Sequence, residues 1–317
     1  FTDEKNTPRR AAASRAFFEY QPLDVGYDPN ASPPDDIRVY RQLSWGRHLD
    51  LFMTDERYYR ADHVIPEGPA NPATGKPLAN TPVGSRYFVR SDGFDAAEAA
   101  ARPSLLGEAQ KAWVIEAITA SRATWKLWGN EVQMYEMALE LARLPILPPL
   151  LDYRVYVSAD QWDGYRSERR EVLEALQGAS VENLVVCTGD IHSFWAAELH
   201  ADFAAPSPKP VGVEYVTAGI SSSSLLALLP TYILGESALS PVADAITDNI
   251  DQALLETNPH LRFADADAYG FALLAFDAAR VQVTFVEVGN PTDPTYRGVV
   301  RRTQLETLAG TSRVSVL

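Results

Sequence analysis

The chain has 317 residues, enough for one large domain or two smaller ones, and its 46% hydrophobic content supports a substantial core. The net charge of −14 and the lack of a Lys and Arg cluster argue against nucleic acid as a partner, because phosphate backbones are bound by clustered cations. No stretch is apolar enough for long enough to span a bilayer. The single cysteine, Cys187, excludes an intrachain disulfide and is predicted to be a small core residue.

The amino-terminal third predicts a helix, a loop and a hairpin. Residues 9–20 read as a helix, and a loop rich in Pro and Asp follows. Apolar residues between 37 and 45 fall on odd positions, which is typical of a half-buried strand. Gly46 ends that strand, and residues 49–54 form the paired return strand. The turn-rich segment 59–103 is long for a compact domain, which indicates an excursion near a site or partial mobility.

Helices then alternate with strands along the rest of the chain. A helix is predicted over 105–121, with Ser104 as its candidate cap. Further helices are expected at 165–176 and 241–256, and strands at 124–128, 154–157, 184–187, 211–217, 269–275 and 281–288, the last two as a hairpin. Short continuous apolar runs such as 184–187 are typical of fully buried strands. The order indicates a mixed α/β protein with helices covering sheets.

The segment 184–192 carries the strongest chemical signal. A buried strand runs into Thr188-Gly189-Asp190-Ile191-His192. Side chains alternate along a strand, so Asp190 and His192 are expected on the same side. Carboxylate oxygen and imidazole nitrogen are both metal ligands, and ligand sites in α/β sheets lie beyond the carboxyl ends of strands. Gly189 would permit a tight turn there. The alternative is that Asp190 caps a following helix and His192 is a polar loop residue.

A wider set of stretches resembles the PhoD-like (alkaline phosphatase D) family of metallophosphoesterases. Residues 188–199 are similar to the last metal motif of that family. Six further stretches agree in order: Arg15–Pro22, Leu51–Arg57, Leu106–Gln110 with Trp113, Trp125–Glu131, Asp160–Tyr165 and Asn258–His260. The similarity runs from about Arg15 to the final hairpin. Ordered agreement of seven stretches is stronger than any one motif.

The resemblance implies a fold, a cofactor and a reaction. The fold would be a four-layer αββα sandwich, in which residues 1–317 form the carboxy-terminal part of one domain. The site would hold iron together with calcium, or another divalent cation, and would hydrolyse phosphomonoesters or phosphodiesters. Asp190 and His192 would be metal ligands and catalytic residues. Asn130 would be a further ligand or a polar group of the site, although Asn after Gly is also a common turn residue.

Other candidates have two readings each. Arg57, with Asp55, either contacts substrate or belongs to an internal ion pair. Trp162 and Tyr165 either line a substrate rim or pack in the core. His260 either lies near the site or is a hydrogen-bonded structural residue. The remaining histidines, His48, His63 and His200, have no ligand-like neighbours and are predicted to be surface or helix residues.

Three elements of the family pattern do not occur in this sequence. They are a Cys after a strand, a Gly-Asp-x-x-Tyr element and an Asp-Asp-His-Glu element. The sequence therefore predicts that the site is completed by a companion amino-terminal polypeptide of the same precursor. The alternatives are a catalytically inactive or structural fragment and a phospholipase D-type phosphodiesterase. By resemblance, the protein would reside in the periplasm or outside the cell.

Overall fold

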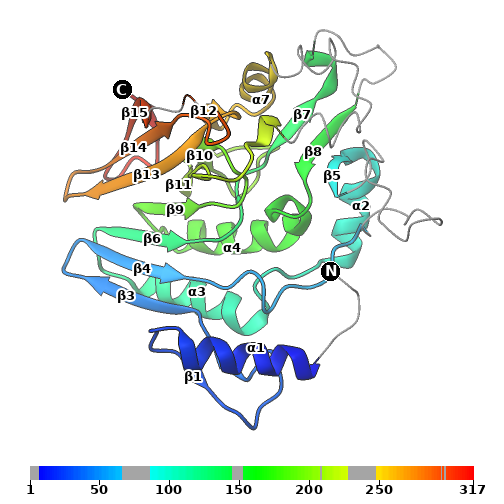
Figure 1. Cartoon of the computed structure of the whole chain (residues 1–317), viewed down its shortest axis with the longest axis vertical. Coiled ribbons are helices and arrows are strands. Elements are labelled where there is room, and N and C mark those ends of the chain that lie inside the picture. Colours follow the sequence, from blue (N-terminus) through cyan, green and yellow to red (C-terminus); the bar gives the residue numbers. More distant parts are fainter. Residues whose placement is uncertain are drawn as a thin grey trace.

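The computed structural model describes residues 7–65, 86–144, 153–207, 209–227, 248–293, 295 and 298–317. Its centre is a seven-stranded sheet (Figure 1). In spatial order the strands are β12 (Leu261–Asp265), β10 (Phe194–Leu199), β11 (Gly212–Val216), β9 (Leu184–Thr188), β6 (Trp125–Gly129), β4 (Leu49–Met53) and β3 (Arg41–Trp45). The four strands β4, β6, β9 and β11 are mutually parallel, so their carboxyl ends lie along the same edge.

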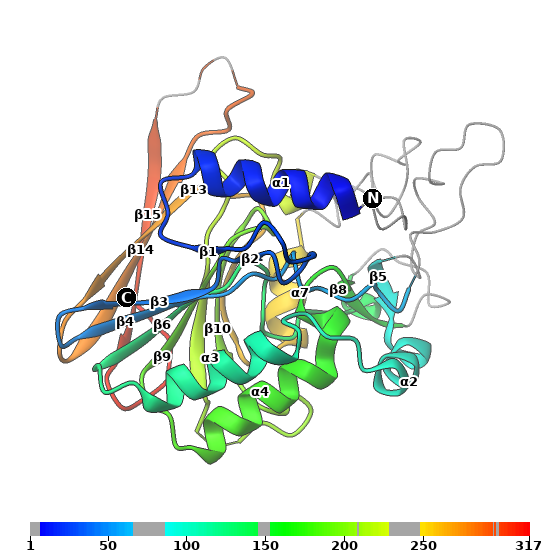
Figure 2. The same ribbon diagram turned by 90° about the horizontal axis from the view of Figure 1, so that it is seen from below.

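One face of this sheet is covered by helices and the other by a second sheet. Helices α3 (Glu108–Ala120) and α4 (Arg166–Gly178) lie together on the first face (Figure 2). The second sheet contains β13 (Tyr269–Phe276), β14 (Arg280–Val288), β15 (Val299–Leu308) and β16 (Ser315–Val316) in that order. In β9, Val186 packs into the core on the helical side and Val185 into the core on the other, as strand alternation requires.

Smaller elements surround the main sheet. Helix α1 (Thr7–Tyr20) lies on the opposite side of the sheet from α3 and α4 (Figure 2). The others are the ladder of β1 (Gly26–Tyr27) with β2 (Ile37–Arg38), the sheet of β5 (Tyr87–Arg90), β8 (Arg154–Ser158) and β7 (Ala138–Glu140), helices α2 (Ser91–Ala101) and α7 (Ile250–Thr257), and the 3₁₀ turns η1 (Leu141–Arg143) and η3 (Trp162–Tyr165). No helix of the described ranges is both long and apolar enough to cross a bilayer.

The mixed α/β class predicted from the sequence is confirmed, as are most of its central elements. The hairpin of β3 and β4 turns at Gly46, which has a φ of +60° and so suits a residue without Cβ. The strands predicted near 125, 154, 184 and 212 and the final hairpin are all present. The described layers are helices, sheet and sheet, and the expected fourth layer stays a prediction.

Several local predictions were wrong. The stretch 37–45 is two strands in different sheets, and Leu43 and Trp45 are exposed because β3 is an edge strand. Helix α3 begins at Glu108 rather than 105, and Ser104 does not cap it. Ser104 instead donates to Glu168 at 2.7 Å and accepts from the Gly107 backbone.

Two predicted segments fall partly outside the described residues. The long segment 59–103 contains β5 and α2, while residues 66–85 lie outside the described ranges. The helix predicted over 241–256 is seen as α7, and residues 241–247 lie outside the described ranges.

Candidate active site at the carboxyl edge of the parallel strands

The candidate residues come together because their strands are parallel and in register. Met53 pairs with Gly129, and Gly129 pairs with Cys187, across β4, β6 and β9. Each strand therefore ends at the same level, and the next residues emerge side by side. Asp55 and Arg57 follow β4, Asn130 and Glu131 follow β6, and Asp190 and His192 follow β9. This is the edge at which open α/β sheets bind ligands.

Asp190 and His192 lie in a turn rather than in the strand. Strand β9 ends at Thr188, and Asp190 and His192 have φ values of +66° and +57°. The argument from strand alternation was therefore wrong, because neither residue is extended. Gly189, which was expected to permit a tight turn, precedes these two residues and has no positive φ of its own. Non-glycine residues in the left-handed region cost about 1–3 kcal/mol, and such strain concentrates at functional sites.

His192 has the protonation geometry of a metal ligand. Its Nδ1 lies 2.9 Å from the backbone oxygen of Ser223, and a carbonyl can only accept, so Nδ1 carries the hydrogen. In the neutral ring, Nε2 then holds a lone pair. Metal-bound histidines are usually fixed in this way, with the second ring nitrogen donating to a carbonyl or carboxylate. The side chain is partly exposed, so Nε2 can be reached.

Asp190 is held from two sides. Gln161 donates from Nε2 to Oδ2 at 2.6 Å, and the Arg57 guanidinium lies 3.6 Å from Oδ1. Gln161 is itself fixed, because its Oε1 accepts from the backbone of Gln133 at 2.6 Å. The sequence analysis found the stretch containing Gln161 but assigned the residue no role. Arg57 forms its ion pair with Asp190 rather than with Asp55, and that pair is partly exposed rather than internal.

Asn130 is buried within a polar network that fixes its amide. Thr188 donates its hydroxyl to Glu214 at 2.6 Å and therefore accepts from Asn130 Nδ2 at 3.1 Å. The amide oxygen faces Trp162 and accepts from its indole nitrogen at 3.0 Å. That oxygen retains a second lone pair with which it could bind a cation. Burial raises the pKa of Glu214 to about 7, although its bonds with Thr188 and with two backbone amides, those of Met134 and Tyr135, oppose the shift.

A pair of glutamates, of which Glu56 is buried and Glu131 is exposed, supports the turn that carries Arg57. Glu56 and Glu131 each accept from the other's backbone amide, at 2.5 and 3.2 Å. Burial, and then the charge of Glu131, raise the pKa of Glu56 to about 8. Asp55 accepts from the backbone of Arg57 at 2.9 Å, and Gln110 bonds both backbone groups of Asp55. Sequence reasoning missed Glu56 and Gln110, which the fold brings together from distant segments.

Trp162, Tyr165 and His260 are used by the core. Trp162 and Tyr165 are fully buried, so neither forms an exposed substrate rim in this structure. The Tyr165 hydroxyl accepts from Arg60 at 2.8 Å. His260 is buried, donates to the Glu136 carbonyl at 2.7 Å and makes a tilted ring contact with Phe203. Burial lowers its pKa to about 4, which fits the structural reading of this residue.

Of the other histidines, His63 and His200 differ from their prediction, whereas His48 is partly exposed. None of the three lies in a helix, and His200 is buried. His63 does have a ligand-like neighbour, because its Nε2 lies 2.7 Å from Asp160 Oδ1. Burial alone would raise the pKa of Asp160, but the bond from His63 and the charge of Arg60 hold it below its usual value. His48 bonds the Thr124 hydroxyl at 3.2 Å.

The described residues fit part of a metal site. His192, Asp190 and Asn130 supply the nitrogen and oxygen donors that iron and calcium use. Within the described ranges, no group of three or more His, Cys, Asp and Glu is close enough to hold an ion. These three residues would supply only part of the donors that iron and calcium together require, because calcium alone takes about six to eight oxygen ligands.

An open α/β sheet with metal-competent side chains at its carboxyl edge has the features of a ligand-binding site of this fold class. The family model for PhoD-like phosphatase matches residues 2–285, and the chain therefore belongs to the PhoD-like phosphatase family. It is 28% identical over 255 residues to alkaline phosphatase D of Bacillus subtilis (strain 168), which covers 80% of this chain and 35% of that protein.

A solved structure of PhoD shows the same fold. It superimposes with a TM-score of 0.67 at 23% identity, covering 98% of this chain and 49% of that one. The chain thus spans about a third of the curated relative and about half of the solved structure.

Proposed function

We propose that this chain supplies part of an active site that hydrolyses phosphate esters, monoesters or diesters, with a metal-activated water. The observation that carries the proposal is the placement of Asn130, Asp190 and His192 directly after two adjacent parallel strands, with His192 Nδ1 bonded to a carbonyl. Membership of the PhoD-like family supports the same reaction. The two alternatives are a catalytically inactive or structural fragment and a phospholipase D-type phosphodiesterase. The first of these is one outcome of the experiment below.

We propose iron and calcium as the cations, held by His192 Nε2, by a carboxylate oxygen of Asp190 and by the amide oxygen of Asn130. Bound metals of this kind polarise the phosphoryl group and lower the pKa of water toward about 7. The chain's own residues orient the site. Ser223 fixes the ring of His192, and Gln161 fixes the carboxylate of Asp190.

Arg57 is the residue we propose to bind the phosphate. Its guanidinium is half exposed and lies at the edge of the site beside Asp190. Arginine forms paired hydrogen bonds with phosphate oxygens, and these bonds are shorter and stronger than those between neutral groups. A phosphoryl group at this position would replace the ion pair with Asp190, which is long at 3.6 Å and therefore weak.

The remaining metal ligands and the fourth layer of the sandwich are proposed to come from a companion segment. The support is the chemistry of the proposed cations, because iron and calcium together require more donors than Asn130, Asp190 and His192 supply. The proposed location is the periplasm or the cell exterior, as the family resemblance implies.

The test uses the full native protein and two variants, Asp190→Ala and His192→Ala. Both should lose metal in elemental analysis and lose phosphate-ester turnover by at least about 100-fold, the scale on which site ligands act. Both should keep the thermal unfolding midpoint within a few degrees when metal is absent from all samples. Intact mass of the same material would identify any second chain.

A matched control is His48→Ala, which removes another partly exposed histidine, one that lies at the opposite end of β4. This variant should keep its metal and turnover. Full turnover in His192→Ala would refute the assignment of that residue. Native protein that binds metal but cleaves no phosphate ester would favour the inactive alternative.

A further inference from the structure

A groove of about 440 Å³ runs between α1, β2 and the end of β4. Its size is within the range of small-molecule sites. The apolar and aromatic residues of its lining are Ala13, Phe17, Leu23, Ile37, Val39, Met53 and Tyr58. The polar and charged residues are Ser14, Arg41, Thr54, Asp55, Arg57 and Glu131. Figure 2 shows α1 lying over β1 and β2, where the groove is formed.

The groove and the candidate active site share a wall. Arg57 lines the groove and lies 3.6 Å from Asp190. Glu131, which also lines it, follows directly on Asn130 at the end of β6. The apolar part of the groove therefore lies next to the guanidinium of Arg57, the proposed phosphate-binding group.

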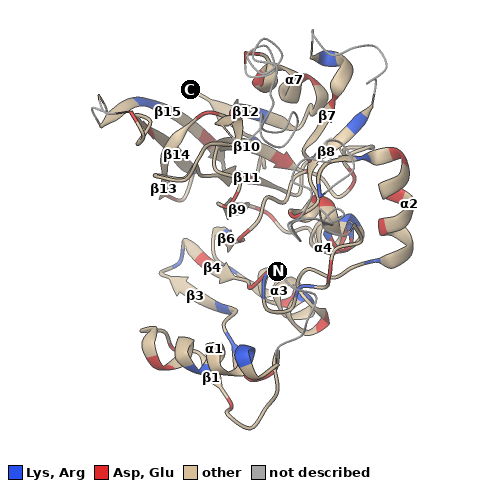
Figure 3. Ribbon diagram, turned by 45° about the vertical axis from the view of Figure 1, so that its right-hand side comes forward, with Lys and Arg blue, Asp and Glu red and all other residues tan. Residues whose placement is uncertain are grey.

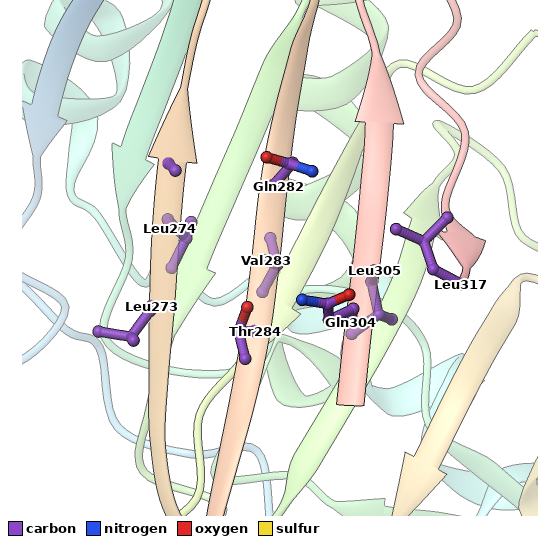
Figure 4. Close-up of a pocket in the computed structure, with 9 residues that line it drawn as sticks. Leu273, Leu274, Gln282, Val283, Thr284, Gln304, Leu305 and Leu317 are labelled. Atoms are coloured by element: carbon purple, nitrogen blue, oxygen red, sulfur yellow. The ribbon is translucent and has the colours of Figure 1, made fainter. Parts of the chain in front are cut away.

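Another hollow among the described residues has no such connection. It is smaller, about 250 Å³, and lies on the strands of the four-stranded sheet. Its lining includes Leu273, Gln282, Thr284, Gln304 and Leu317 (Figure 4), and it contains no charged side chain. It offers nothing to an anionic group.

We propose that the groove binds the apolar alcohol part of the phosphate ester, with the phosphoryl group beside Arg57 and Asp190. This inference rests on the proposed function and specifies its substrate class, namely esters of alcohols with an alkyl or aryl substituent. The charges agree with this orientation. Arg57 attracts the anionic end, and Asp55 and Glu131 would repel a second anionic group placed in the groove. The other cation of the lining, Arg41, donates to the Val39 carbonyl at 2.9 Å.

The amount of discrimination follows from the hydrophobic effect. Each buried methylene contributes about 0.8 kcal/mol, which is about a fourfold gain in kcat/KM if all of it is realised in the transition state. We expect kcat/KM to rise two- to fourfold per methylene from methyl to hexyl phosphate. The rise should stop when the chain exceeds the groove.

The experiment measures this series with the metal-loaded full-length protein and two tryptophan variants. Ala13→Trp places a large ring in the groove and should flatten the dependence on chain length. Ala12→Trp, one residue earlier on the same exposed helix and outside the groove lining, should retain the dependence. Phe17→Ser, which removes an apolar wall, is a second variant and should also reduce the slope.

The outcomes separate the inference from the function on which it rests. Hydrolysis of every ester with no dependence on chain length would overturn the groove while leaving the phosphatase function intact. An unchanged slope in both Ala13→Trp and Phe17→Ser would overturn it too. If the protein hydrolyses none of the esters, titration calorimetry with alkyl phosphonates would measure binding to the groove instead. Affinity that rises with chain length would then support the groove and refute the function, and flat affinity would refute both.

Discussion

Two arginine–carboxylate pairs in this molecule have the same chemistry and opposite surroundings. Asp163 and Arg169 lie 2.7 Å apart with side chains 0% and 4% exposed. Arg57 and Asp190 lie 3.6 Å apart with side chains 49% and 35% exposed. Acidic and basic residues gather at the start of α4, where the buried pair is found (Figure 3).

The difference lies in how far each pair is already satisfied. Asp163 also accepts from the backbone of Met137 at 2.8 Å, and Arg169 donates to the Met134 carbonyl at 2.9 Å. The charged groups of Asp163 and Arg169 are therefore fully bonded within the protein. The exposed pair gains little from its contact in water and keeps its charges accessible. Burial thus separates an ion pair that holds the structure from one available to a phosphate or a cation.

The largest expected effect comes from breaking the buried pair. Asp163→Ala removes the nearest carboxylate of Arg169 and leaves only its longer contact with Glu136, at 3.8 Å, in the core, which should lower the free energy of unfolding by about 3–5 kcal/mol. Asp190→Ala, the matched change at the exposed pair, should lower it by less than about 1 kcal/mol. Urea unfolding of both variants without metal gives the comparison. Equal losses would contradict the division of the two pairs into structural and functional.

A second prediction concerns His260, whose burial should make the free energy of unfolding depend on pH. Its pKa is about 4 in the folded protein and about 6.5 when unfolded. As pH falls below 6.5, the unfolded chain binds a proton that the folded protein refuses, so stability declines until pH 4. The decline attributable to His260 is at most about 3 kcal/mol.

His260→Gln can keep a donor to the Glu136 carbonyl but cannot titrate. Its unfolding free energy should therefore fall less between pH 6.5 and 4 than that of the parent. Some slope remains, because burial also lowers the pKa of His200. His48→Asn is the control and should retain the full slope. The same slope in His260→Gln and the parent would show that His260 is not buried in solution.

The parts of the site that sequence reasoning found are those with a local signal. The run Leu184–Cys187 is apolar and short, so a buried strand ending before Asp190 was predictable. Parallel alignment of β4, β6 and β9 then follows from the alternation of helices and strands. It brings Asp55, Asn130 and Asp190 to one edge without any contact having to be known.

The parts that were missed depend on contacts between distant segments. Gln161 touches Asp190 across 29 positions, and Glu56 meets Glu131 across 75. Strand β10 was missed because all its residues are buried, which removes the alternation that marks a strand. The left-handed conformations at Asp190 and His192 had no local signal, since the sequence indicated only a tight turn at Gly189.

The smallest predicted effect tests whether the buried network of Thr188, Asn130 and Glu214 influences metal binding at the carboxyl edge of the sheet. Thr188→Val keeps the shape of the side chain but removes the hydroxyl that accepts from Asn130 and donates to Glu214. The amide of Asn130 would lose its orientation, and metal affinity should fall about 10- to 100-fold, as is usual when a group behind a ligand is lost. Thr188→Ser restores the hydroxyl and should recover most of that loss. Metal titration of both variants separates an effect on orientation from an effect on folding. If Thr188 had a purely structural role, Thr188→Val would be less stable, but the metal affinity of the folded fraction would not change. Unchanged affinity in that fraction would show that Asn130 does not bind the metal or does not need Thr188 to do so.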